Sequence, residues 1–241
     1  MLIIKNVSAV LDATDLLKNI TIEVNSGEIH AIMGPKGTGK SSLGHLIAGH
    51  PSIVQTEGSI TFNKKNISRL DCDDRAAIGI SITFQNPPEM LGLKNYDLAK
   101  LILKSKKDKR SDHEIEEAYK ELCKSLKLDD DHGNQSMDYD DMTATDFRKN
   151  ELLLLLLINP KLAIIDEVDT DMDDDDIALI GESIKRFANE KNSIIVITHN
   201  QKLLDIVVPS HVHILVNGEI KEHGNTQLYK RIVEDGYPQF S

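Results

Sequence analysis

The chain has 241 residues, a net charge of −11, 4% aromatic residues and no Trp. Duplex DNA binding depends on neutralising phosphates, and stacking of single-stranded nucleic acid depends on aromatic side chains, so the composition disfavours a nucleic-acid partner. The two cysteines, Cys72 and Cys123, are too few for a disulfide framework or a four-cysteine zinc site. They predict two reduced thiols in a cytoplasmic protein.

In chain order, short aliphatic runs bounded by polar residues alternate with helix-like runs. This alternation predicts an α/β fold whose sheet is mainly parallel, because buried parallel strands read as continuous apolar runs. The pair Asn217-Gly218 predicts a hairpin turn. The predicted strands cover 2–7, 21–24, 28–33, 59–62, 81–84, 162–165, 193–198 and 211–216, and the predicted helices cover 42–48, 173–189 and 201–206.

The middle of the chain has a different pattern. Residues 96–128 are charged and helix-periodic, which predicts an inserted helical region. Residues 129–146 hold seven Asp and predict a solvated loop that leads into another helix. The aliphatic run 152–158 fits a core helix ending at Asn159-Pro160.

Neither a membrane span nor a targeting segment is expected. The run 152–158 is far shorter than the ~20 residues that cross a bilayer. The N-terminus also lacks a basic segment followed by a long apolar one.

A phosphate-binding motif follows the strand predicted at 28–33. G-x-x-x-x-G-K-[ST] is matched at every fixed position, and the flanking strand and helix are those the motif requires. Its glycines let backbone N–H groups turn toward phosphate oxygens, and the helix N-terminus adds its positive dipole end. Lys40 would supply a point charge to the β- and γ-phosphates, and the Ser41 hydroxyl would bind Mg²⁺. The predicted ATP-binding residues here are Gly34, Pro35, Lys36, Gly37, Thr38, Gly39, Lys40, Ser41 and Ser42.

Further polar groups come where predicted strands end. Asp166 is predicted to hold Mg²⁺, and Glu167 to polarise the attacking water as general base. His199 reaches the same sheet edge and is predicted to contact the γ-phosphate. Gln85 follows the strand 81–84 and is predicted to bind in the ATP site and sense Mg²⁺ or the water. The predicted catalytic residues are Lys40, Glu167 and His199, and the predicted Mg²⁺ ligands are Ser41, Gln85 and Asp166.

Two other groups of possible ligands are predicted to have no functional role. His211 and His213 fall on one face of the strand predicted at 211–216. Two histidines without a third ligand are more often structural than metal-binding, so we expect both to be structural. Cys72-Asp73-Asp74 predicts an exposed loop.

The order of phosphate loop, glutamine, helical insert, Asp-Glu strand and histidine resembles the ATPase subunits of the ABC superfamily over nearly the whole chain. The resemblance implies one domain over 1–241. A P-loop NTPase core with an antiparallel β subdomain would cover 1–87 and 159–241, and a helical subdomain with the signature loop would cover 88–158. It also implies that Mg·ATP is closed between two head-to-tail protomers of a homo- or heterodimer. By the same resemblance, Gln85 belongs to the Q-loop and Asp173 to the D-loop.

Five local stretches are similar to one branch of this superfamily, the SufC-type ATPases of SUF iron–sulfur cluster assembly. That resemblance implies ATP binding and hydrolysis coupled to conformational change, with a soluble SufB-like scaffold protein as partner. It implies work in the cytoplasm or the plastid stroma. The stretches are 31–40, 84–92, 148–153, 198–205 and 228–237.

The segment before Arg148 departs from the ABC signature Ser-Gly-Gly-Gln/Glu. This chain has Thr143-Ala144-Thr145-Asp146 there, without either glycine. If the backbone at Thr145 needs a positive φ, a β-branched residue is strained there, and the Asp146 carboxylate repels ATP. We therefore expect weak ATP-dependent homodimerisation and slow hydrolysis, both improved when Ala144 and Thr145 are changed to glycine.

Two other functions stay open from the sequence. The altered signature fits a nucleotide-binding scaffold whose hydrolysis is weak or lost. The helical insert fits the ATPase subunit of a transporter, docked on a membrane subunit. A measurement of ATP turnover distinguishes the nucleotide-binding scaffold from a SUF-type ATPase. The identity of the co-purified partner distinguishes the transporter subunit from it.

Overall fold

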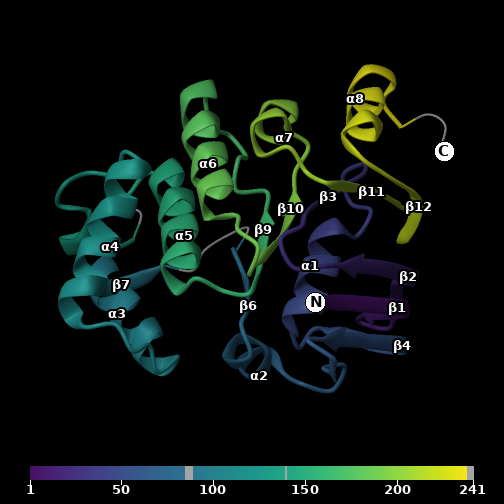
Figure 1. Cartoon of the computed structure of the whole chain (residues 1–241), viewed down its shortest axis with the longest axis horizontal. Coiled ribbons are helices and arrows are strands. Elements are labelled where there is room, and N and C mark those ends of the chain that lie inside the picture. The colour runs from purple at the N-terminus through teal and green to yellow at the C-terminus, as the bar shows by residue number, and fades with distance from the viewer. Residues whose placement is uncertain (85–88, 139, 238–241) are drawn as a thin grey trace.

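The computed structural model describes residues 1–84, 89–138 and 140–237. Figure 1 shows the teal helices α3–α5 beside a central sheet, with the N-terminal strands at its other side. The strands are β1 (Leu2–Leu11), β2 (Thr14–Val24), β3 (Ile29–Met33), β4 (Ile53–Phe62), β5 (Lys65–Asn66), β6 (Ile80–Ile82), β7 (Met90–Lys94), β8 (Ser136–Met137), β9 (Leu162–Asp166), β10 (Ser193–Ile197), β11 (His211–Val216) and β12 (Glu219–Gly224). The helices are α1 (Lys40–Ala48), α2 (Cys72–Ala77), α3 (Asn95–Ser105), α4 (Asp112–Ser125), α5 (Ala144–Ile158), α6 (Asp174–Phe187), α7 (Gln201–Val207) and α8 (Thr226–Asp235), with a 3₁₀ turn at His132–Asn134.

A six-stranded sheet lies at the centre, in the order β12-β11-β3-β10-β9-β6. All neighbouring pairs are parallel except β11 with β12, which confirms the predicted mainly parallel sheet. Every residue of β9 and β10 is buried, because helices cover both faces. Ile164 and Ile195 face the core cluster that includes α1, whereas Ile165 and Val196 face the cluster of α5 and α6.

A second sheet, antiparallel and ordered β2-β1-β4-β5, packs over α1. Leu2 and Ile4 are buried and alternate with the exposed Ile3 and Lys5, as expected for a sheet with one covered face. The strands here are longer than predicted. Asn6, at a φ of 49°, lies at an irregularity of the β1–β2 ladder, and β1 continues past the predicted end at Val7 to Leu11.

Three helices form the inserted region, since α3 and α4 cover most of 96–128 and α5 packs against both. This confirms the predicted helical insert. The leucines at 152–157 are all buried, in one core cluster with α3, α4, α6 and the central sheet. A helix that is apolar all round is expected only in such a covered position.

The prediction of a solvated loop over 129–146 is wrong in part. His132 is 1% exposed, Met137 is fully buried and Met142 is 4% exposed. Met137 lies in β8, which pairs with β7, so a partner about 45 residues away in the sequence orders this acidic segment. The helix also begins at Ala144 and not after Asp146.

The hairpin predicted at Asn217-Gly218 is confirmed. Val216 pairs with Glu219, and both turn residues have positive φ, 52° and 78°, as the tight turn between twisted strands demands. Cys72 is exposed, Cys123 is buried, and both are free thiols. Within the described residues, no helix has the length and apolar character needed to cross a bilayer.

Candidate functional site

The predicted phosphate loop lies between β3 and α1, on the edge of the central sheet where β9 and β10 also end. Gly34 follows β3 so closely against β11 that a Cβ there would lie 1.9 Å from the carbonyl oxygen of Leu215. Gly39 caps α1 in the left-handed region, at a φ of 98°. Only glycine meets both demands without strain. The motif spacing therefore follows from the geometry of a strand that turns sharply into a helix.

Lys40 lies across this loop. Its Nζ donates hydrogen bonds to the carbonyl oxygens of Gly34 at 3.0 Å and Pro35 at 2.9 Å. Burial lowers the pKa of Lys40, while the carboxylates of Glu167 and Asp166 oppose that shift. The Thr38 hydroxyl also donates to Pro35 O, at 3.0 Å. A buried ammonium group is thus held at the start of α1, where the helix dipole also favours an anion.

Ser41 and Asp166 meet as predicted. The Ser41 hydroxyl donates to Asp166 Oδ1 at 3.1 Å. Asp166 is fully buried, and its Oδ2 has no hydrogen-bond partner among the described residues. Burial raises the pKa of Asp166 to about 6; the Ser41 hydrogen bond lowers it and Glu167 raises it.

The structure brings Glu167 and His199 together. His199 Nε2 lies 3.3 Å from Glu167 Oε1. Burial lowers the pKa of His199, and Lys40 lowers it further, against the opposite effect of the Glu167 and Asp169 carboxylates. Glu167 itself has a positive φ of 46°, directly after β9, and its N–H donates to Ile197 O. The ends of two parallel strands thus place a carboxylate and an imidazole beside Lys40.

Gln85 lies outside the described residues, so its predicted contact stays a prediction. The segment that leads to Gln85 is held by hydrogen bonds to two other elements, β9 and α5. Thr83 Oγ1 accepts a hydrogen bond from the Asp166 N–H at 2.9 Å, and the Phe84 N–H donates to Glu151 Oε2 at 3.1 Å. Burial raises the pKa of Glu151 to about 7. Sequence reasoning missed Thr83 and Glu151, because only the fold brings α5 to this strand end.

The prediction of backbone strain at Thr143–Asp146 is wrong. Thr143 caps α5 at a φ of −73°, and neither Ala144 nor Thr145 has a positive φ. Thr143 Oγ1 accepts from the Asp146 N–H at 3.1 Å, and Asp146 Oδ2 accepts from the Thr143 hydroxyl at 2.7 Å. The two side chains form a capping box, so this backbone needs no glycine to form a helix.

The acidic stretch after Asp166 is better balanced than its sequence indicates. Asp173 caps α6 by accepting from the N–H groups of Asp175 and Asp176, at 3.0 and 2.8 Å. The buried Lys149 lies 2.5 Å from Asp176 Oδ1, and Lys202 lies 3.1 Å from Asp174 Oδ2. Neither lysine is predictable as a partner of this stretch, because both belong to other helices. The helix N-terminus also favours these carboxylates.

Residues 17–170 match the model of the family described as ABC transporter. The chain is 37% identical to the probable ATP-dependent transporter ycf16 of Cyanophora paradoxa, over 97% of this chain and 92% of that protein. It is 30% identical to vegetative protein 296 of Bacillus subtilis, over 98% and 91%. It is 32% identical to ABC transporter I family member 6, chloroplastic, of Arabidopsis thaliana, over 94% and 68%.

Solved structures show the same fold. The ATP-binding cassette MJ0796, described as a dimer in a post-hydrolysis state bound to ADP and Pi, matches with a TM-score of 0.81 over 93% of this chain and 98% of that chain. A second structure, described as the ATP-binding subunit of an ABC transporter, matches with a TM-score of 0.79 over 97% and 93%. Identities of 22% and 21% make these likenesses ones of fold alone.

Proposed function

Since the chain belongs to the ABC transporter family, we propose that residues 34–42 bind the phosphates of ATP and that Gln85, Glu167 and His199 act on its hydrolysis. The predicted division into a core, 1–87 with 159–241, and a helical subdomain, 88–158, belongs to the same proposal. Proteins of this family bind and hydrolyse ATP with Mg²⁺ in ATP-dependent dimers.

The observation that carries the proposal is the pairing of Ser41 with Asp166. A buried carboxylate with an unpartnered oxygen, 3.1 Å from a hydroxyl at its other oxygen, fits a hard divalent cation, because Mg²⁺ takes oxygen ligands. Ser41 and Asp166 would hold the ion, with Gln85 as the third predicted ligand. When bound, Mg²⁺ neutralises phosphate charge.

The remaining chemistry falls to this chain's own side chains. Lys40 would bind the phosphates through its ammonium group, and Glu167 would accept a proton from the attacking water. His199, 3.3 Å from Glu167, would fix the position of that carboxylate and contact the γ-phosphate. The lowered pKa of His199 favours a neutral ring, whose Nε2–H can donate to the Glu167 carboxylate and orient it.

The biological role we propose is iron–sulfur cluster assembly. In this proposal the chain acts in the cytoplasm as one protomer of a homo- or heterodimer. ATP binding and hydrolysis in that dimer drive a conformational change in a soluble SufB-like scaffold protein. The five local similarities to SufC-type ATPases support it. The second candidate is the ATPase subunit of a transporter, which the printed names of the ycf16 relatives favour. A third, a scaffold with weak hydrolysis, is favoured by the closed capping box at Thr143–Asp146.

ATP turnover with and without the co-purified partner tests these roles. A soluble scaffold protein that raises turnover supports the SUF role, and recovery of an integral membrane partner alone contradicts it. Nucleotide binding is tested separately by thermal shift with Mg·ATP. A ligand at 100-fold its Kd stabilises by about 2.7 kcal/mol. Lys40→Ala should lose most of this shift, and the control Lys124→Ala, an exposed lysine of α4, should keep it.

A further inference from the structure

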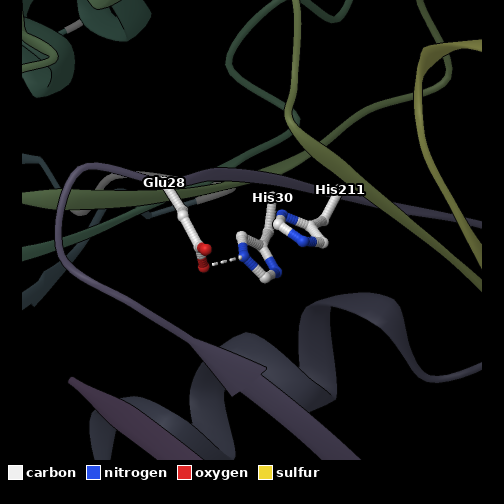
Figure 2. Close-up of side chains that lie close together, drawn as sticks. All are labelled: Glu28, His30 and His211. Carbon is white, nitrogen blue, oxygen red and sulfur yellow. Dashed lines mark hydrogen bonds and ion pairs between the residues drawn. The ribbon is translucent and has the colours of Figure 1, made fainter.

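Four histidines and one glutamate gather away from the phosphate loop, where β3, β11 and β12 lie side by side. His30 of β3 is in register with His211 of β11, and His213 of β11 is in register with His223 of β12. Glu28 precedes β3 and points at His30 (Figure 2). The sequence shows two of these histidines on one strand, but only the strand order brings the others to them.

A chain of hydrogen bonds connects the group. Glu28 Oε2 lies 2.9 Å from His30 Nε2, His30 Nδ1 lies 2.8 Å from His213 Nε2, and His213 Nδ1 lies 2.7 Å from His223 Nδ1. With an ionised Glu28, His30 Nε2–H donates to it, so His30 Nδ1 must accept. His213 Nε2–H then donates to His30, and His223 Nδ1–H donates to His213. Glu28 thus fixes the tautomer of each ring in turn.

The donor types suit a metal ion. Carboxylate oxygens and imidazole nitrogens are common protein ligands of transition metals. Glu28, His30 and the rings behind them are held in one connected hydrogen-bond network.

We propose that Glu28, His30 and His211 bind one divalent transition-metal ion. Their donor atoms all lie within 4.8 Å of one another. The rings of His30 and His211 are stacked, with centroids 4.4 Å apart, and His211 Nδ1 is engaged by Ser210 Oγ at 3.0 Å. This leaves His211 Nε2 as the coordinating atom. An imidazole and carboxylate set suits Zn²⁺ and its neighbours in the first transition row.

The fit requires a movement, and the residue that must move is the exposed one. Zinc bonds of about 2.0–2.1 Å need donors closer together than in the present arrangement. His30 is fully buried and bonded on its far side to His213, so it stays in place. His211 is exposed and is able to turn toward Glu28. A buried, oriented imidazole with an exposed second ligand gives a site that opens to solvent.

The hydrogen-bond chain lets His30 give up its Nε2 proton at the cost of one bond, the one from His30 Nε2 to Glu28, which two bonds to the metal would replace. When the metal takes Nε2, that proton moves to Nδ1, which then donates to His213 Nε2. The proton of His213 moves to its Nδ1, which donates to His223 Nδ1, and the proton of His223 moves to its Nε2. Every ring stays neutral, no proton leaves, and the two hydrogen bonds between rings only reverse. Such outer partners of a metal-bound histidine fix its orientation and tautomer.

This metal site is separate from the proposed ATP site. His30 lies four residues before Gly34, which at ~3.3 Å per residue puts it roughly 13 Å down β3 from the loop. A metal there would link β3 to β11 without touching the phosphates. Its binding should therefore be independent of Lys40, so failure of the ATP proposal leaves this one intact.

Calorimetric titration of the chelator-treated full chain with Zn²⁺, in excess Mg²⁺ to occupy oxygen-only sites, tests the proposal. We expect one saturable Zn²⁺ per chain. His211→Ala and Glu28→Gln should each weaken binding at least ~tenfold, and His223→Ala by ~10–100-fold as for other outer partners. The control His50→Ala removes one ring of another stacked histidine pair, His45 with His50, and should bind as the wild type does, as should Lys40→Ala.

Cobalt gives a second readout at the same atoms. Co²⁺ in this imidazole and carboxylate set should show visible absorption bands that His211→Ala removes and His50→Ala retains. Absence of saturable Zn²⁺ binding in the wild type would overturn the proposal. So would wild-type affinity in both His211→Ala and Glu28→Gln, or an equal loss in His50→Ala.

Discussion

The helices α1 and α5 both begin at segments that the sequence associates with phosphate, but their first turns differ. α1 is capped by Gly39, with no side-chain hydrogen bond at the cap and no acidic residue in the first turn. α5 is capped by Thr143 and carries Asp146 in its first turn, joined in a capping box. The first N–H groups of a helix have no partner within it. In α5 the Thr143 side chain accepts from one of them, the Asp146 N–H, and in α1 no side-chain cap does so.

The difference fits the proposed phosphate site at α1, because a helix N-terminus is more open to an anion where no side chain of its own caps it. At α1 the nearest charge is the buried ammonium group of Lys40, which adds to the helix dipole. At α5 the nearest charge is the Asp146 carboxylate, which opposes an incoming phosphate. Four tests, from the largest expected effect to the smallest, break or sharpen this contrast.

The largest effect should come from a change at Glu167, the proposed general base beside the start of α1. Glu167→Gln keeps the shape of the side chain but cannot accept a proton. Turnover should fall by roughly 10²–10⁴-fold, the usual contribution of a general base, with the Mg·ATP thermal shift unchanged. Steady-state phosphate release measures this, and equal rates in variant and wild type would contradict the assignment of Glu167.

The second test compares two glycines of the same loop. Gly34→Ala would put a methyl group 1.9 Å from Leu215 O, so β11 must shift. We expect a loss of about 3 kcal/mol or more in unfolding free energy, from overpacking and left-handed strain together. Gly37, at a φ of 80°, has nothing within 4 Å of its Cβ position. Gly37→Ala should cost only about 1–2 kcal/mol; equal losses in denaturant unfolding would refute the close approach.

The third test concerns the interior of α5, where Glu151 is buried. Its pKa is raised by burial from 4.5 to about 7, so the folded state binds more protons than the unfolded state between these values and loses stability as pH rises. Glu151→Gln should match the wild type near pH 4 and exceed its stability by about 3 kcal/mol at pH 8. Glu182→Gln, at an exposed position of α6, serves as control and should show no such pH-dependent gain.

The smallest effect separates charge from backbone at the start of α5. Asp146→Asn should tighten ATP-dependent self-association about tenfold, or ~1.4 kcal/mol, since it removes the carboxylate that would face the partner's phosphate in the proposed dimer. Changing Ala144 and Thr145 to glycine should instead lower the Tm, because glycine costs up to about 1 kcal/mol per helical position. Analytical ultracentrifugation with ATP distinguishes the two. If only the double glycine variant formed a stronger dimer, the loss of the two signature glycines, and not the Asp146 charge, would be what weakens dimerisation.

The parts of the site that could be predicted are those marked by short motifs of consecutive residues. The phosphate loop, Asp166 and Glu167 follow from short motifs at strand ends, and the structure brings Ser41 to Asp166 and His199 to Glu167 as expected. The start of α5 was misread because the reciprocal bonds of Thr143 and Asp146 were not recognised as a helix start.

Other features depend on strand order, which no local pattern contains. Glu151 reaches Phe84, Lys149 reaches Asp176, and His30 reaches His213 across 183 positions of sequence. Each pair joins elements that are distant in the chain but adjacent in the fold. The length of β1 was underestimated for a related reason, since pairing with β2 carries it past the predicted end at Val7 to Leu11.

The six leucines of α5 have a consequence for synthesis of the chain. Their core cluster includes Ala163 and Ile165 of β9, Val196 of β10, and Val207 at the end of α7. When synthesis reaches the end of α5, none of these residues of β9, β10 and α7 has been made. About 50 further residues must then be added, which takes several seconds at 5–20 residues per second. Until then the leucine side chains of α5 lack these packing partners. During that interval only the earlier helices α3 and α4 of its core cluster are available to cover it, so this stage of synthesis exposes apolar surface that favours aggregation.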